Sequence, residues 1–135
     1  MYILILSEIV LHSKYNTTYH GRQNNIHDFI KNSHAIILPS YHEGMANVLL
    51  EAAACGRPIL ASKVPGCIET FNEGVSGLGF EPRNDDSLVQ TIIEFIKMPY
   101  EQKKIMGIAG RQKIEKEFDR QLVVNANMEE IGKII

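Results

Sequence analysis

The sequence of 135 residues lacks the marks of several large protein classes. It has only two cysteines, Cys55 and Cys67, whose spacing fits no zinc motif, so we expect two free, packed thiols. No run of about 18 apolar residues occurs, which argues against a membrane-spanning helix. The N-terminus lacks the basic region and cleavage site of a secretory signal, so we expect a cytoplasmic protein.

An excess of charge of one sign is also absent. The 14 basic and 16 acidic residues give a net charge of −2, which provides no reason to expect nucleic acid as a partner. The histidines fall on different predicted elements, and no two have the helical i,i+4 spacing of metal ligands. We therefore expect no metal site at the five histidines, His12, His20, His27, His34 and His42.

Short apolar runs predict the strands. A continuous run at 35–38, stopped by Pro39-Ser40, is typical of a central strand that is buried on both faces of a parallel sheet. Similar reasoning predicts strands at residues 2–6, 17–19 (ending in a turn at Gly21), 59–61 and 78–80.

Helical patterns separate these runs. We expect Asn25 to cap a helix with Asp28 in its first turn, and Gly56 and Pro58 to end a helix over residues 46–55. A short helix is predicted at 68–71. The C-terminal part then reads as helices that start at Asp85, at Pro99 (running to about Phe118) and at Asp119.

The alternation of strands and helices predicts an α/β fold with a Rossmann-like parallel sheet of about four to five strands, helices on both faces and a helical C-terminal tail. We interpret residues 1–135 as a single domain with an atypical start (1–14), an α/β core (15–81) and the helical tail (85–135). In such folds ligands bind beyond the carboxyl ends of the strands, which favours the loops 39–46 and 61–67.

Two glutamates stand out in the first of these regions. Glu43 precedes the predicted helix and Glu51 lies on its second turn. A carboxylate can accept hydrogen bonds from both hydroxyls of a vicinal diol, so the pair suits a ligand that contains a ribose or a hexose. A simpler interpretation is that Glu43 only caps the helix and that the spacing arises by chance.

The backbone beside Glu43 suits a phosphate. Gly44 allows a sharp turn, after which the amides of Met45, Ala46 and Asn47 would be free at a helix N-terminus and would point towards an anion. A phosphate position beside two diol positions indicates a nucleoside-diphosphate sugar as the ligand.

Residues 39–69 resemble the signature of the C-terminal, donor-binding domain of retaining GT-B-fold glycosyltransferases of family 4, the glycosyl transferases group 1. The matching segments are Pro39-Ser40-Tyr41, Glu43-Gly44, Leu50-Glu51-Ala52, Cys55-Gly56-Arg57-Pro58 and Pro65-Gly66-Cys67-Ile68-Glu69. The similarity continues through Gly74, Gly77 and the helical tail, so that it covers about residues 16–135.

The resemblance implies a role for individual residues. Glu43 would be the catalytic carboxylate that contacts the transferred sugar, and Glu51 would hold the ribose diol. Gly44, Met45, Ala46 and Asn47 would lend backbone amides to the sugar or phosphate, while Gly21 and Arg22 would lie near the base. No metal or other cofactor is implied, because positive side chains and helix ends neutralise the diphosphate in this family.

The resemblance also implies an N-terminal acceptor domain, supplied by the complete enzyme or by a separate subunit, and an Arg and a Lys that clamp the diphosphate upstream of the aligned region. Residues 1–14 match the family poorly. We therefore expect a donor-binding half of an enzyme that transfers a sugar to a saccharide or lipid-linked acceptor in polysaccharide or cell-envelope glycan synthesis, with little activity in isolation. A stand-alone binding subunit and an inactive remnant remain alternatives, and peripheral membrane contact and self-association stay open.

Overall fold

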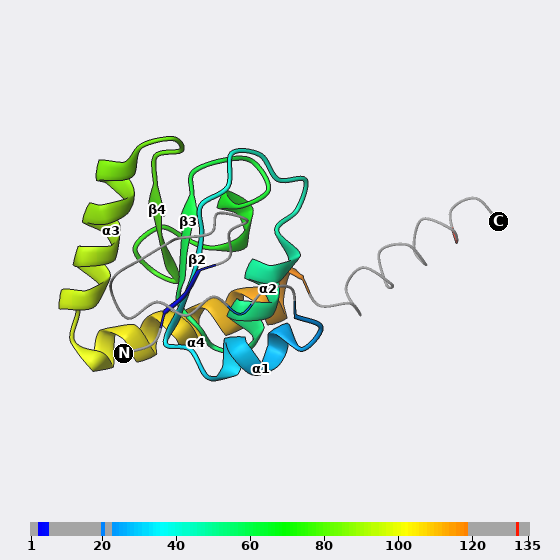
Figure 1. Ribbon diagram of the computed structural model, residues 1–135. Coiled ribbons are helices and arrows are strands. Elements are labelled where there is room, and N and C mark those ends of the chain that lie inside the picture. Colours follow the sequence, from blue (N-terminus) through cyan, green and yellow to red (C-terminus); the bar gives the residue numbers. More distant parts are fainter. Residues whose placement is uncertain (1–2, 6–19, 21–22, 119–131, 133–135) are drawn as a thin grey trace.

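The computed structural model describes residues 3–5, 20, 23–118 and 132 (Figure 1). Their strands are β1 (Ile3–Ile5), β2 (Ala35–Leu38), β3 (Ile59–Ser62) and β4 (Gly77–Phe80). Their helices are α1 (Ile26–Lys31), α2 (Asn47–Ala54), the short 3-10 helix η1 (Ile68–Thr70), α3 (Asp85–Lys97) and α4 (Tyr100–Glu117).

The four strands form one parallel sheet in the order β1-β2-β3-β4. Because successive crossovers are right-handed and move in one direction, the connecting helices must lie on the same face of the sheet. Ile30 of α1 and Leu49 of α2 accordingly share a buried cluster with Ile36 and Ile59. This arrangement leaves the opposite face of the sheet to be covered by helices that follow β4.

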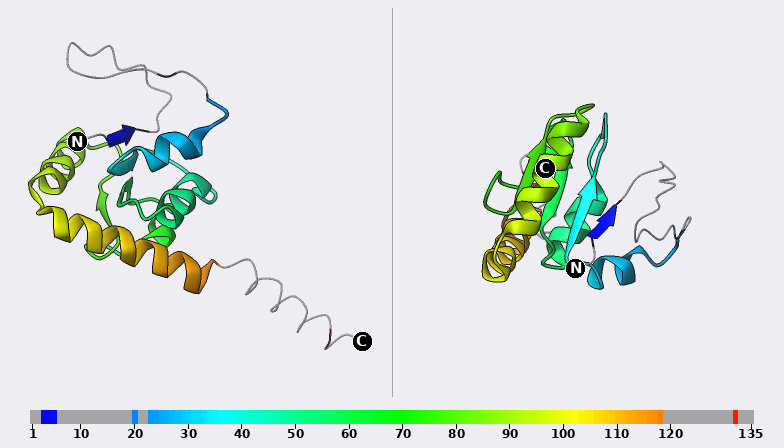
Figure 2. Two further views of the ribbon diagram at one scale, coloured as in Figure 1. Left: turned by 90° about the horizontal axis from the view of Figure 1, so that it is seen from below. Right: turned by 60° about the vertical axis from the view of Figure 1, so that its left-hand side comes forward.

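The helix α3 covers that opposite face. Its Phe95 is fully buried in a second cluster with Ile37, Leu60 and Phe80, side chains that alternate with those of the first cluster along the strands. Figures 1 and 2 show α3 and the pair α1 and α2 on different sides of the sheet. The predicted α/β fold, with a parallel sheet and helices on both faces, is therefore confirmed.

The strands at the centre agree with the prediction most closely. All four residues of β2 and all four of β3 are buried, as continuous apolar runs indicate for strands covered on both faces. The helix α2 ends as expected, since Gly56 takes the left-handed conformation with φ +70°. The predicted strand at 17–19 and the helix expected from Asp119 lie outside the described residues.

The prediction for the cap of α1 is wrong in its mechanism. Asn25 does precede the helix, but its side chain accepts no hydrogen bond from the helix amides. The side-chain nitrogen Nδ2 of Asn25 instead lies 3.5 Å from Oδ2 of Asp28. A side-chain cap occurs at α3, where Oδ1 of Asn84 accepts a hydrogen bond of 2.9 Å from the amide of Ser87.

The helix α4 runs across the amino ends of the strands, below the sheet in Figure 1. Its Met106 belongs to the core cluster on the α3 side, and its Ile114 packs against the cluster on the α2 side. The helix therefore connects both layers. It comes closest to the turn after α2, where a Cβ on Gly107 would lie 2.1 Å from the carbonyl oxygen of Gly56.

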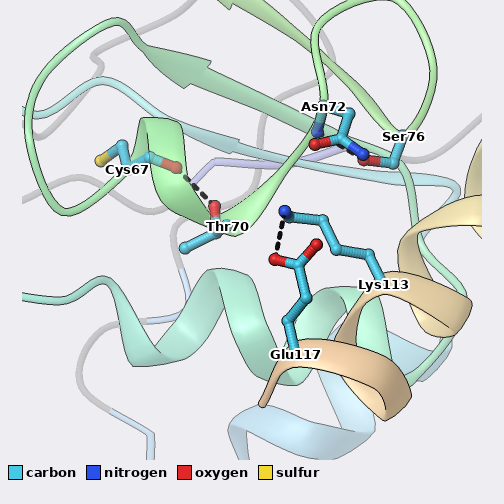
Figure 3. Close-up of polar contacts among 6 residues, drawn as sticks. All are labelled: Cys67, Thr70, Asn72, Ser76, Lys113 and Glu117. Atoms are coloured by element: carbon cyan, nitrogen blue, oxygen red, sulfur yellow. Dashed lines mark hydrogen bonds and ion pairs between the residues drawn. The ribbon is translucent and has the colours of Figure 1, made fainter.

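The far end of α4 carries a pair of charges beneath η1. Lys113 donates a hydrogen bond of 2.6 Å to Glu117, and only 9% of the lysine side chain is exposed (Figure 3). Above this pair, the Thr70 hydroxyl donates to the carbonyl oxygen of Cys67 and so closes η1. Each of these two polar contacts therefore closes its own element, η1 in one case and the last turn of α4 in the other.

The edge strand β4 is partly closed by the turn that precedes it. The amide of Gly74 donates to the carbonyl oxygen of Gly77, and Oε2 of Glu73 accepts a hydrogen bond of 2.8 Å from the amide of Gly79. Two outward-facing backbone groups of the edge therefore have partners within the same turn.

We expect Gly107→Ala to destabilise the protein by about 1–3 kcal/mol, because the new methyl group would overlap the Gly56 carbonyl and force α4 away from α2. Gly110→Ala is the matched control on the same helix, since its Cβ would meet Ala53 at an ordinary 3.6 Å and alanine favours helix. Urea unfolding of both variants tests this, and equal stabilities would contradict the close approach.

Candidate active site

Two loops meet beyond the carboxyl ends of β2 and β3. Gly66 has φ +86°, and a Cβ there would lie 2.5 Å from the carbonyl oxygen of Glu43 and 2.8 Å from that of Gly44. Only glycine allows both this conformation and this distance. The carbonyl oxygen of Gly66 also accepts a hydrogen bond of 3.0 Å from the amide of Ala46. The second loop therefore fixes the backbone of the first directly beside Glu43.

Glu43 lies before α2, as predicted, and is partly buried. Its Oε1 accepts a hydrogen bond of 2.8 Å from the hydroxyl of Ser40, three residues earlier in the same loop. Because this bond occupies one side of one carboxylate oxygen, Glu43 keeps acceptor positions for a ligand.

The amides after Gly44 are only partly available. The amide of Ala46 donates to Gly66, and that of Asn47 donates to the carbonyl oxygen of Met45 at 2.9 Å. The expectation that these two amides are free is therefore wrong, because Gly66 is 20 positions from Ala46 and approaches it only in the folded chain, and because the backbone turns back on Met45 before α2 begins. Among the described residues, the amide of Met45 has no hydrogen-bond acceptor. The backbone roles predicted for Gly44, Met45, Ala46 and Asn47 stay predictions.

Glu51 lies in the middle of α2 and faces α1. Its Oε2 is 3.8 Å from Nε2 of His27, and both side chains are substantially exposed. Sequence reasoning missed this neighbour, because 24 positions separate the two residues and only the packing of α1 beside α2 brings them together. The contact is long and exposed, so it leaves the Glu51 carboxylate accessible to a ligand.

A cation that the sequence analysis did not select lies at the same edge of the sheet. Arg83 follows β4, and its guanidinium carbon is 5.0 Å from the ring centroid of Tyr41, in the loop before Glu43. Arg83 is the only residue other than glycine with a positive φ, 56°, in the described part of the chain. This conformation costs a residue with a side chain about 1–2 kcal/mol, more than an exposed cation–π contact of about 0.5–1 kcal/mol returns.

The loop after β3, the neighbour of β4 in the sheet, places further charges at the carboxyl edge. Nζ of Lys63, which follows β3, lies 3.6 Å from Oε1 of Glu81. Oε2 of Glu69 accepts a hydrogen bond of 2.7 Å from the amide of Gly66. A shallow hollow beside these residues is lined by Lys63, Ile68, Phe71 and Glu73, and it includes neither Glu43 nor Glu51.

The thiol of Cys67 is fully buried and lies near two of the carboxylates at this edge. Burial, with the negative charges of Glu43 and then Glu69, raises the pKa of Cys67 from 9.0 to about 11. Both Glu43 and Glu69 therefore lie close enough to act on one thiol. Cys55 is partly exposed, and both cysteines are free.

The Cys67 thiol should make stability depend on pH in the alkaline range. Below pH 9 the thiol is protonated in the folded and unfolded chains, whereas above it only the unfolded chain ionises until the folded pKa of about 11 is reached. We therefore expect the free energy of unfolding to fall between pH 9 and 11, and to fall less steeply in Cys67→Ala. Denaturant titrations at several pH values test this, and identical slopes would contradict the burial of the thiol beside the carboxylates.

The remaining predicted site residues, Gly21 and Arg22, lie outside the described residues, as does His12. In the described part of the chain, no group of three or more His, Cys, Asp or Glu side chains could hold a metal ion. None of the helices there has the length and apolar character needed to cross a membrane.

A parallel sheet with helices on both faces defines the class as an α/β protein, and in open sheets of this class ligands generally bind beyond the carboxyl ends of the strands, where Glu43 and Glu51 lie. Comparison with known sequences identifies the family. Residues 10–113 match the glycosyl transferases group 1, and the chain belongs to this family.

Individual proteins agree with this assignment. The chain is 35% identical over 74 residues to the N,N'-diacetylbacillosaminyl-diphospho-undecaprenol alpha-1,3-N-acetylgalactosaminyltransferase of Campylobacter jejuni, which is 55% of this chain and 20% of the relative. Its fold is similar to that of Anabaena HepE, solved in complex with UDP-glucose, with a TM-score of 0.68, 21% identity, and coverage of 79% of this chain and 29% of HepE.

A third similarity is to a single domain. The C-terminal domain of a group 1 glycosyl transferase, LpcC of Francisella tularensis, matches with a TM-score of 0.66 and 16% identity, covering 77% of this chain and 53% of that domain. At these identities the structural matches show the fold. The chain spans only 20% of the length of the Campylobacter relative.

Proposed function

We propose that this chain is the donor-binding half of a glycosyltransferase that takes a sugar from a nucleoside-diphosphate sugar, with retention of configuration at the anomeric carbon. The acceptor is a saccharide or a lipid-linked glycan in polysaccharide or cell-envelope synthesis. The enzyme acts in the cytoplasm or at the inner face of the membrane and needs no metal.

The observation that carries the proposal is the placement of Glu43 in the loop before α2 and of Glu51 in the middle of α2, beyond the carboxyl edge of the sheet. Each carboxylate can accept two hydrogen bonds from a vicinal diol, and a nucleotide sugar carries diols on the ribose and on the hexose. The available amide of Met45, at the entry to α2, suits a phosphate between them.

The known proteins support the same chemistry. HepE has been solved with UDP-glucose, and the Campylobacter relative is named for the transfer of N-acetylgalactosamine to a diphospho-undecaprenol-linked acceptor. The match to a C-terminal domain supports the donor half, because nucleotide sugars bind to that half in the family the sequence resembles.

Donor binding separates the roles proposed for the two glutamates. Glu51→Ala should weaken the binding of both UDP and UDP-glucose by about 1–3 kcal/mol, because hydrogen bonds to a charged group are lost. Glu43→Ala should weaken the binding of UDP-glucose but leave the binding of UDP unchanged, because Glu43 is assigned to the transferred sugar. Calorimetric titration measures the affinities of both variants. GDP, ADP and their sugar derivatives are titrated as well, since the base of the nucleotide has not been assigned.

Glu94→Ala is the matched control, since it removes one exposed negative charge from α3 without touching the site. Equal affinities in wild type, Glu51→Ala and Glu94→Ala would exclude the proposed ribose contact. Absence of binding by the wild type at millimolar concentrations of every nucleotide would favour the inactive remnant over the enzyme.

We further propose that the 135-residue chain transfers sugar slowly or not at all by itself. Transfer requires that donor and acceptor are held together away from water, and this needs a second binding surface facing the carboxyl edge. A donor-hydrolysis and transfer assay with the purified chain tests this. Turnover at ordinary enzyme rates would show that the chain is sufficient. Activity that appears only with an acceptor-domain polypeptide would favour the stand-alone subunit.

A further inference from the structure

We infer that Arg83, stacked on Tyr41, binds a phosphate of the nucleoside-diphosphate ligand at the carboxyl edge of the sheet. The inference rests on the proposed donor function and adds to it a residue that lies outside the loop and helix with the two glutamates. Three features of the structure support this role: the backbone of Arg83, its contact with Tyr41 and the charges around it.

The backbone position of Arg83 does not require an arginine. Its φ of 56° belongs to the left-handed region, which glycine adopts without strain. The turn is fixed on either side, by β4 before it and by Asn84, which caps α3, after it. An arginine is therefore strained here where a glycine would not be, and an observed outlier of this kind points to a function of the side chain.

The stacking geometry leaves the arginine ready to bind an anion. The guanidinium lies 5.0 Å from the ring centroid of Tyr41, so one π face is used while the N–H groups in its plane stay available. These N–H groups form the planar fork that matches two phosphate oxygens. Tyr41 belongs to the same loop as Glu43, which brings the cation towards the ligand loop from the neighbouring side of the sheet.

The surrounding charges favour a cation at this position. Glu43 lies in the loop that Gly66 contacts, and the Glu69 carboxylate accepts a hydrogen bond from the Gly66 amide, so two negative charges flank the contact between the loops where the diphosphate is proposed to bind. Lys63 is already paired with Glu81. Arg83 makes no ion pair within the described part of the chain, and it can therefore offset the repulsion between the carboxylates and the phosphates.

Arg83→Gln and Arg111→Gln form a matched pair that tests the inference. Each removes one exposed arginine, but Arg111 lies on α4, where it pairs with Glu115 and donates to the carbonyl oxygen of Ala54. We expect Arg83→Gln to weaken the tightest-binding nucleoside diphosphate among UDP, GDP and ADP about tenfold, the loss typical of one hydrogen-bonded charge. Arg111→Gln should bind it as the wild type does. Binding of the corresponding nucleoside, which has no phosphate, should be unchanged in both.

Arg83→Gly separates binding from stability. This variant relieves the left-handed strain but adds conformational freedom to the unfolded chain and removes the contact with Tyr41, so its melting temperature should stay close to that of the wild type while its affinity for the diphosphate falls. An unchanged melting temperature excludes partial unfolding as the reason for weak binding. The inference is overturned if Arg83→Gln binds the diphosphate as the wild type does. It is also overturned if this variant loses as much affinity for the nucleoside as for the nucleoside diphosphate. If the wild type binds no nucleotide at all, the donor function fails, and the inference fails with it.

Discussion

The site depends on one backbone contact between two loops. Gly66 lies against the Glu43–Gly44 peptide at a distance that no side chain allows, and its carbonyl oxygen holds the amide of Ala46. This contact fixes where α2 begins and therefore where Glu43 and Glu51 lie. The same segment continues into η1, which begins after Cys67 and is closed by the hydrogen bond from the Thr70 hydroxyl to the Cys67 carbonyl oxygen (Figure 3). The position of Glu43 thus depends on a contact between two loops that are distant in the sequence.

The architecture explains why the ends of the sheet have different roles. Strands in chain order place α1 and α2 on one face, so the chain must turn back after β4 to cover the other with α3. The helix α4 then occupies the amino ends of the strands and joins both core clusters. Within the described part of the chain, α4 thus covers the amino ends of the strands, and the loops that follow β2 and β3 meet at the opposite, carboxyl edge.

The sequence predicted those parts of the fold that local pattern determines. The run Ala35–Leu38 is apolar throughout because it is buried on both faces, and Gly56 ends α2 because only a left-handed residue fits there. Contacts between distant segments could not be predicted in this way. The Ala46 amide bonds to Gly66 across 20 positions, and Arg83 reaches Tyr41 across 42. Nothing local in the sequence encodes either pairing, although both determine which groups at the site are available.

The hydrogen bond from Gly79 to Glu73 has a consequence for how copies of the chain could associate. A sheet edge normally recruits a strand from another molecule through its unpaired amides and carbonyls. On β4 the Glu73 carboxylate and the Gly74 amide already fill two of these positions. A strand from a second molecule would have to displace a charged acceptor before it could pair. This edge therefore resists intermolecular sheet extension, and a second molecule is less able to pair a strand with β4.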